Sequence, residues 1–130
     1  MSGGLCLIAG LLVAPLGDAV MLRWTHSIQK VAWEEDYRRA GNTLQLVSAR
    51  VHGTGAGMEP PPDAVFRDGA WHYLPTVLPL PGIVLSHSPY AAPYIVCNDT
   101  VCQPVTAWLP GLSETATIEL APCRSSLSAP

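Results

Sequence analysis

The sequence is poor in charged residues, which make up only 13% of its 130 residues, about half of the usual share. Seven of them are Lys or Arg, the formal net charge is −3, and the cationic residues form no basic stripe. Proteins bind nucleic acid chiefly through clustered positive charge. The composition therefore argues against a nucleic-acid partner.

Long apolar runs are also lacking. The run at residues 5–13 is too short to span a membrane, because a spanning helix needs about 20 apolar residues. Its length also fits a signal sequence, with Gly17 and Ala19 as small residues before a cleavage site. No Lys or Arg precedes the run. Two interpretations of residues 1–19 stay open, a cleaved signal and a buried strand pair, and the missing positive charge favours the strand pair.

Helix breakers, in contrast, are abundant. Thirteen prolines and eleven glycines are spread along the chain, which argues against long helices. Side chains instead alternate with a period of two, as in a strand with one buried face. Val20, Leu22 and Trp24 share one face of such a strand, and Met21 and Arg23 share the other.

Two hairpins are predicted from turn signals between apolar arms. Residues 33–51 are divided by an Ala-Gly-Asn turn, and residues 65–73 by an Asp-Gly pair, which is among the strongest short hairpin signals. We therefore expect a mostly β chain, folded as a single small sandwich or barrel of about seven to nine short antiparallel strands. It covers residues 1–123, and the Ser- and Ala-rich residues 124–130 form a disordered tail.

Four cysteines are present, and one pair is a disulfide candidate. Cys97 and Cys102 flank a turn signal, and a tight hairpin can bring two such side chains within bonding range. A disulfide would imply an oxidising compartment. The alternative is two half-buried free thiols in a cytosolic protein. A zinc site is disfavoured because no second cysteine pair or histidine cluster has ligand spacing.

Polar residues gather in three pieces of the chain that can converge at one end of a β domain. The first holds Trp24, His26 and Ser27, the second Glu34 and Glu35, and the third is a glycine loop followed by prolines. The candidate residues of this loop are Gly55, Gly57, Met58 and Glu59. The loop lacks the Lys-Ser/Thr of a phosphate-binding loop, so a nucleotide site is not expected.

An enzyme is one interpretation of these pieces. His26 would act as a base and Ser27 as a nucleophile, with a carboxylate orienting the histidine. Neighbouring residues of a regular strand point to opposite faces, so His26 and Ser27 cannot pair unless the strand bulges. We therefore assign no catalytic residue and lean against an enzyme.

A metal site is a second interpretation, in which His26 with Glu35 or Glu59 holds a divalent ion. The other histidines are scattered, and the acids are not spaced as a calcium loop. The simpler expectation is that Glu34 and Asp36 lie on a solvated strand face opposite Arg38 or Arg39. No metal and no cofactor are expected.

Three motifs together resemble the family called domain of unknown function 1850. They are Trp-Thr-His-Ser at residues 24–27, Trp-Glu-Glu-Asp-Tyr at 33–37, and the glycine- and proline-rich stretch at 53–64. The likeness extends through Arg-Asp-Gly-Ala-Trp-His-Tyr at 67–73. It also takes in Leu-Cys-Leu at 5–7, as a first strand, and the Cys97–Cys102 segment.

This resemblance implies a context without an activity, since the family has no assigned catalytic residues. Its genes tend to accompany TAXI-type TRAP transporters, often with a fused permease. It implies a non-enzymatic accessory or binding domain of solute uptake, in the periplasm or another extracytoplasmic space. A permease, a solute-binding protein or a small solute would be the partner. The alternative is a hydrolase or metal-dependent enzyme using His26 with Glu35 or Glu59.

Overall fold

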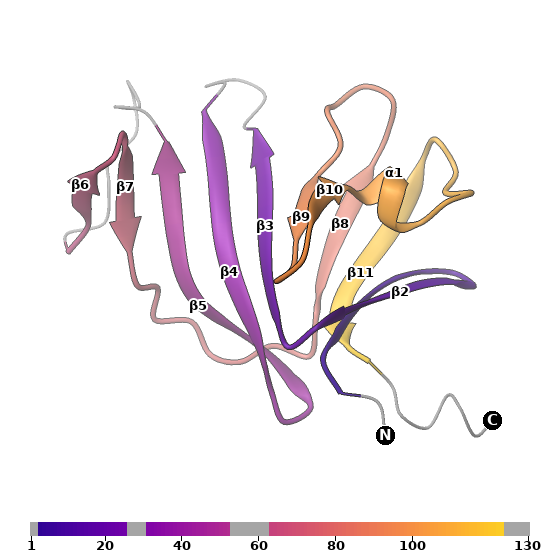
Figure 1. The fold of residues 1–130 in the computed structure, drawn as a ribbon, viewed down its shortest axis with the longest axis horizontal. Helices are drawn as coiled ribbons and strands as arrows, with labels where there is room; N and C mark the ends of the chain where they lie inside the picture. Colours follow the sequence, from indigo (N-terminus) through magenta and orange to yellow (C-terminus); the bar gives the residue numbers. More distant parts are fainter. Residues whose placement is uncertain (1–2, 26–30, 53–62, 124–130) are drawn as a thin grey trace.

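A computed structural model describes residues 3–25, 31–52 and 63–123, and there the chain forms eleven strands and one short helix. The strands lie in two antiparallel sheets, one of four strands and one of seven (Figure 1). Neither sheet closes into a barrel within these residues. The expectation of a mostly β, sandwich-like fold is confirmed, although more strands form than the seven to nine that were expected.

The four-stranded sheet joins the beginning of the chain to its end. Its order is β2 (Leu12–Gly17), β1 (Leu5–Ala9), β11 (Ala116–Pro122) and β8 (Ile83–His87). Leu7 of β1 is opposite Leu120 of β11, and both side chains are fully buried. The apolar run near the start is therefore a strand pair, turned at Gly10, which has a φ of 60°.

The seven-stranded sheet contains both predicted hairpins. Its order is β10 (Cys102–Pro104), β9 (Ile95–Cys97), β3 (Ala19–Thr25), β4 (Ala32–Ala40), β5 (Thr43–His52), β7 (Ala70–Tyr73) and β6 (Val65–Arg67). Asp68 and Gly69 have φ of 52° and 78°, as both central residues of the favoured hairpin turn require. The β4–β5 hairpin is longer than expected, with strands of nine and ten residues.

The core lies between the two sheets. Its members are apolar side chains that point inward from both, namely Leu5, Leu7, Ala14, Leu16, Val20, Leu22, Tyr37, Leu44, Leu85, Val96, Val105, Leu109, Ile118 and Leu120. The predicted alternation of β3 is confirmed, because Val20 and Leu22 are buried while Arg23 is exposed. The short helix α1 (Val105–Trp108) adds Val105 to this core.

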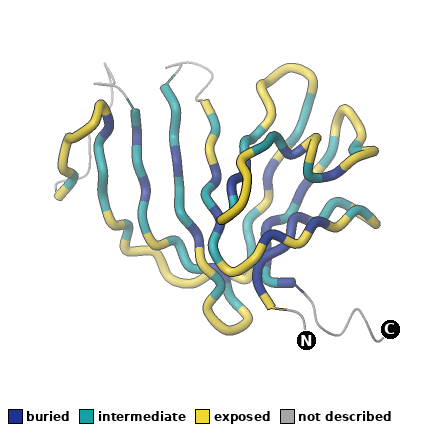
Figure 2. The backbone as a smooth tube through the Cα atoms, in the orientation of Figure 1, coloured by how far each residue is buried: buried dark blue, intermediate teal, exposed yellow. Residues whose placement is uncertain are grey.

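The four-stranded sheet covers the seven-stranded sheet unevenly. Figure 1 shows β6 and β7 at the opposite side of the view from β1, β2 and β11. Among the described residues, neither β6 nor β7 contributes to the main core cluster, and Figure 2 shows their backbone mostly as intermediate or exposed. We call β6 and β7 the free wing and the rest of the sandwich the covered half.

Both pairs of cysteines form disulfides. Cys97 and Cys102, the predicted candidates, are directly opposite each other on β9 and β10. Cys6 and Cys123 form a second disulfide, which joins residues 117 positions apart and ties β1 to the end of β11. The sequence offered no partner for these two residues.

Within the described residues, no helix is long and apolar enough to cross a membrane.

Candidate functional site

The outer face of the seven-stranded sheet carries a cluster of charged side chains on its central strands β3, β4 and β5. On β4, Tyr37 points into the core, so Glu34 and Asp36 project from the other side. Their cross-strand neighbours point the same way: Arg23 and Arg50 flank Glu34, and Ser48 is opposite Asp36. Together with His52 and His72, these side chains form what we call the charged face.

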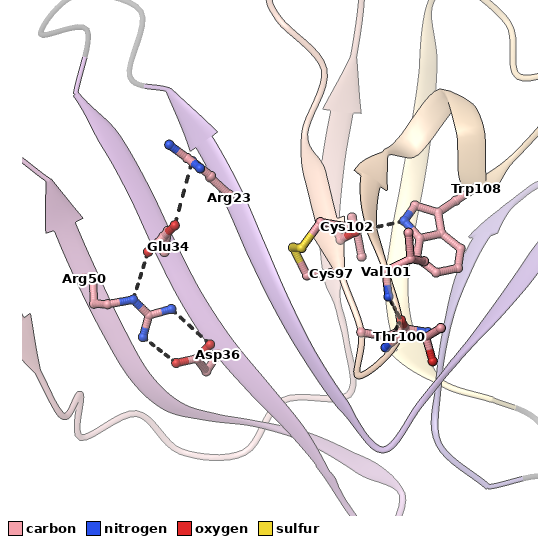
Figure 3. The surroundings of a disulfide bond; sticks show 11 residues. Arg23, Glu34, Asp36, Arg50, Cys97, Thr100, Val101, Cys102 and Trp108 are labelled. Carbon is pink, nitrogen blue, oxygen red and sulfur yellow. Dashed lines mark hydrogen bonds and ion pairs between the residues drawn. A yellow bond between two sulfur atoms is a disulfide. The ribbon is translucent and has the colours of Figure 1, made fainter.

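Arg50 is the centre of the charged face (Figure 3). Its Nε donates to Glu34 Oε1 at 2.9 Å. Its Nη1 and Nη2 donate to the two oxygens of Asp36 at 2.6 and 3.2 Å, a bidentate arrangement that fixes the planar guanidinium. Arg23 approaches the other oxygen of Glu34 at 3.8 Å. One arginine therefore holds two carboxylates in place.

Glu34 has 9% of its surface exposed and is the only buried charged residue in the described part of the chain. Burial acts to raise the pKa of Glu34, but hydrogen bonds from Arg50 and from His52, whose Nε2 is 2.9 Å from Glu34 Oε1, outweigh it and lower the pKa. The same balance lowers the pKa of Asp36, which accepts from Arg50 and from the Ser48 hydroxyl. Both carboxylates are therefore ionised at neutral pH.

The expectation that Glu34 and Asp36 lie on a solvated face opposite Arg38 or Arg39 is wrong. Their partner is Arg50, because the β4–β5 register places it beside Glu34 and a register shift follows Asp36. Arg39 donates instead to the backbone oxygens of Gly4 and Gly41.

Two hollows border the charged face. One, of about 500 Å³, has both polar and apolar lining: Ser48, Ala49, Arg50, Asp63, Val65, Arg67, His72, Tyr73 and Leu74. The other, of about 340 Å³, lies toward β9, where Met21, Asp36, Arg38 and Cys97 are among its lining residues. Volumes of this order suit a small molecule or a protruding side chain of a partner.

The structure separates Glu35 and Trp24 from the charged face, although the sequence grouped them with Glu34. The hydroxyl of Tyr37 donates to Glu35 Oε1 at 2.7 Å on the opposite side of β4. Burial and this carboxylate raise the pKa of Tyr37 well above its usual range. Trp24 stacks on Trp33 with ring centroids 6.2 Å apart and packs against the core. Alternation along the strand explains the separation.

The remaining predicted site residues are His26, Ser27, Gly55, Gly57, Met58 and Glu59, and all of them lie outside the described residues. The alternative enzyme site, which pairs His26 with Glu35 or Glu59, is therefore not placed. Within residues 3–25, 31–52 and 63–123, no three His, Cys, Asp or Glu side chains are grouped so that they could hold a metal ion.

Sequence reasoning missed Ser48, Arg50 and His52. These three alternate along β5, so they share one face of the strand. Applying the period-two rule to β5 as well as to β3 and β4 would have grouped them on one strand face, while the residues of β4 that they oppose depend on the register. Because the sequence has so few charged residues, three polar side chains on one face of a strand could have marked that face as a candidate site.

Glu34 and Asp36 are poorly suited to act as general bases. A general base needs a pKa near the working pH, whereas both carboxylates have lowered pKa values and accept hydrogen bonds already. The Ser48 hydroxyl donates to Asp36, which is a weak base in this state. The face therefore presents fixed donors and acceptors beside a hollow.

A comparison with known protein families identifies one family whose model matches this chain. The family model described as domain of unknown function (DUF1850) matches residues 20–104. This match includes every residue of the charged face and leaves out residues 5–7, which the motif likeness had included. No curated protein and no solved structure matches the chain.

Proposed function

Because the chain belongs to the DUF1850 family, we propose that it is a non-enzymatic accessory domain of TAXI-type TRAP transporter uptake and binds its partner through the charged face. The partner is the permease or the solute-binding protein, or else a small solute. The gene association that the family resemblance implies supplies this context. The description of the family assigns no reaction.

The observation that carries the proposal is the ion-pair network of Glu34, Arg50 and Asp36. Its charges are held by mutual hydrogen bonds, so Glu34, Arg50 and Asp36 keep one pattern of donors and acceptors at neutral pH. Fixed, complementary charge gives specificity to protein interfaces. The more exposed Arg23 and Arg67 stand at the edges of the network, where they can pair with acidic groups of a partner.

An extracytoplasmic location is part of this proposal. All four cysteines are in disulfides, and disulfides persist mainly in oxidising compartments such as the bacterial periplasm.

Co-purification tests the partner. We expect tagged wild-type protein to retain the cognate solute-binding protein or permease, and a deletion strain to lose uptake. The variant Arg23→Gln with Arg67→Gln should lose the interaction, because it removes two cations at the edge of the charged face. The matched control is Thr115→Glu with Thr117→Glu, which also lowers the net charge by two units, at exposed positions at and just before β11. It should bind as wild type does.

The opposite result is equally clear. If neither protein is retained and uptake is normal in the deletion strain, the proposed function is wrong.

A further inference from the structure

The two disulfides differ in how easily another molecule can reach them. Cys6 and Cys123 have only 4% and 9% of their surface exposed. In the second disulfide, Cys97 is equally buried at 7%, but Cys102 is exposed on the edge strand β10. A thiolate must approach one sulfur of a disulfide to react with it. Of the four cysteines, Cys102 is the most exposed, and Cys97 is mostly buried but lines the hollow of about 340 Å³.

The β9–β10 hairpin is held by hydrogen bonds in addition to its disulfide. The side-chain oxygen of Asn98 accepts from the backbone N–H groups of Thr100 and Val101, each at 2.9 Å (Figure 3). The Asn98 amide donates to the backbone oxygen of Leu16 at 2.9 Å, which ties the turn to β2. Trp108 Nε1 donates to the backbone oxygen of Val96 at 3.0 Å. None of these bonds uses a cysteine side chain, so breaking the sulfur–sulfur bond removes none of their donors or acceptors.

The energetic roles of the two disulfides differ as well. A disulfide stabilises a protein mainly by closing a loop in the unfolded chain, and the effect grows with the length of the loop. Cys6 and Cys123 are 117 residues apart, whereas Cys97 and Cys102 are 5 apart. The exposed disulfide is therefore the one that the fold can lose at smaller cost.

We propose that Cys97–Cys102 is a thiol–disulfide exchange site for a dithiol partner, with the Cys102 sulfur as the atom attacked. The assignment rests on the exposure of Cys102, the burial of Cys97 and the hairpin hydrogen bonds that use no cysteine side chain. It does not depend on the charged face or on its partner.

The exchange consists of two successive attacks by the thiolates of the partner. A thiolate of the dithiol forms a bond to the Cys102 sulfur, and the Cys97–Cys102 bond breaks. Cys97 leaves as a thiolate and takes a proton from water, since burial favours the neutral thiol. The second thiolate of the partner then attacks its own sulfur in the mixed disulfide and releases the Cys102 thiolate. The partner is oxidised to a disulfide, and the protein is reduced to a dithiol.

Burial of Cys97 also affects the reverse step. To expel the bound partner, Cys97 must attack as a thiolate, and the thiolate fraction of a buried thiol is small. With a monothiol reagent, which has no second thiol to release it, the mixed disulfide at Cys102 should therefore persist long enough to be trapped.

Timed reduction of the folded wild-type protein tests the assignment. The protein is treated with dithiothreitol, free thiols are alkylated at intervals, and peptides are analysed by mass spectrometry. We expect Cys97 and Cys102 to be labelled at least about tenfold faster than Cys6 and Cys123, with an unchanged far-ultraviolet circular dichroism spectrum. Equal rates for both pairs, or faster labelling of Cys6 and Cys123, would overturn the proposal.

Single-cysteine variants of this hairpin identify the sulfur that is attacked. Cys97→Ala leaves Cys102 free, and Cys102→Ala leaves Cys97 free, in the same hairpin. With a chromogenic aromatic disulfide, Cys102 should react at least about tenfold faster than Cys97. Equal reactivity, or faster reaction of Cys97, contradicts the assignment, and the wild-type time course still decides if either variant fails to fold.

Discussion

The covered half and the free wing differ in what lies behind each strand. In the covered half, two sheets pack face to face, and Leu7, Leu22, Ile118 and Leu120 are fully or almost fully buried. In the free wing, Phe66 keeps 45% of its surface exposed. The charged face lies between these regions: β4 has the core behind it at Tyr37, while the larger hollow is lined partly by β6 and β7. The main core and the larger hollow thus lie at different parts of the seven-stranded sheet.

The largest expected effect on stability comes from removing the disulfide of the covered half. Replacing both Cys6 and Cys123 by alanine removes the cross-link over 117 residues, and should lower the free energy of unfolding by about 5 kcal/mol. Replacing both Cys97 and Cys102 should cost only about 2 kcal/mol, because the loop is short. Urea unfolding of both double variants measures this, and equal losses would refute the difference.

Truncating one apolar side chain in each region gives the next largest effect. Leu120→Ala empties a fully buried site and should destabilise the protein by about 3 kcal/mol. Phe66→Ala in the free wing should cost less than about 1.5 kcal/mol, since the ring is about half exposed and packs edge-on against Trp71. Thermal or urea unfolding compares the two. A larger loss for Phe66→Ala would place the main core elsewhere.

Removing the central cation of the charged face should have a smaller effect. Arg50→Gln leaves Glu34 and Asp36 without their main partner and should lower the free energy of unfolding by about 2 kcal/mol. The control is Arg23→Gln, because the Arg23 side chain is 50% exposed and only 3.8 Å from Glu34, so its loss should cost about 0.5 kcal/mol or less. If Arg50→Gln is as mild as its control, the network does not stabilise the sheet.

Acid should remove the stabilisation that the network supplies. The folded pKa values of Glu34 and Asp36 lie below the ordinary 4.5 and 3.8. Their contribution is therefore fully present above those values and is lost as the pH falls through the lowered folded values. The difference in unfolding free energy between wild type and Arg50→Gln should shrink as the pH falls from about 6 to about 3. A difference that is constant over this range contradicts the ionised network.

Local features of the fold could be predicted from sequence, and long-range pairings could not. The Asp68-Gly69 turn, the alternation of β3 and the Cys97–Cys102 pair each depend on residues within one hairpin. The pairing of β1 with β11 joins the two ends of the described chain, and no local pattern specifies it. The same holds for Cys6 and Cys123, which become neighbours only through that pairing.

At the candidate site, too, local features could be predicted from the sequence and the pairing between strands could not. Alternation places Glu34 and Asp36 on one face of β4, which the sequence predicts. Their partner depends on the register of β5, and the register shift between Asp36 and Tyr37 cannot be read from turn signals. The sequence analysis offered Arg38 or Arg39 as the partner, and only the β4–β5 pairing identifies Arg50.

The most direct test of the account is the affinity of the purified domain for the cognate solute-binding protein and permease, measured alongside its unfolding free energy. For Arg23→Gln with Arg67→Gln, we predict a loss of affinity of about tenfold or more, with a change in stability of no more than about 1 kcal/mol. The control Thr115→Glu with Thr117→Glu should keep both values. Unchanged affinity in the arginine variant, or an equal loss in the control, would contradict recognition through the charged face.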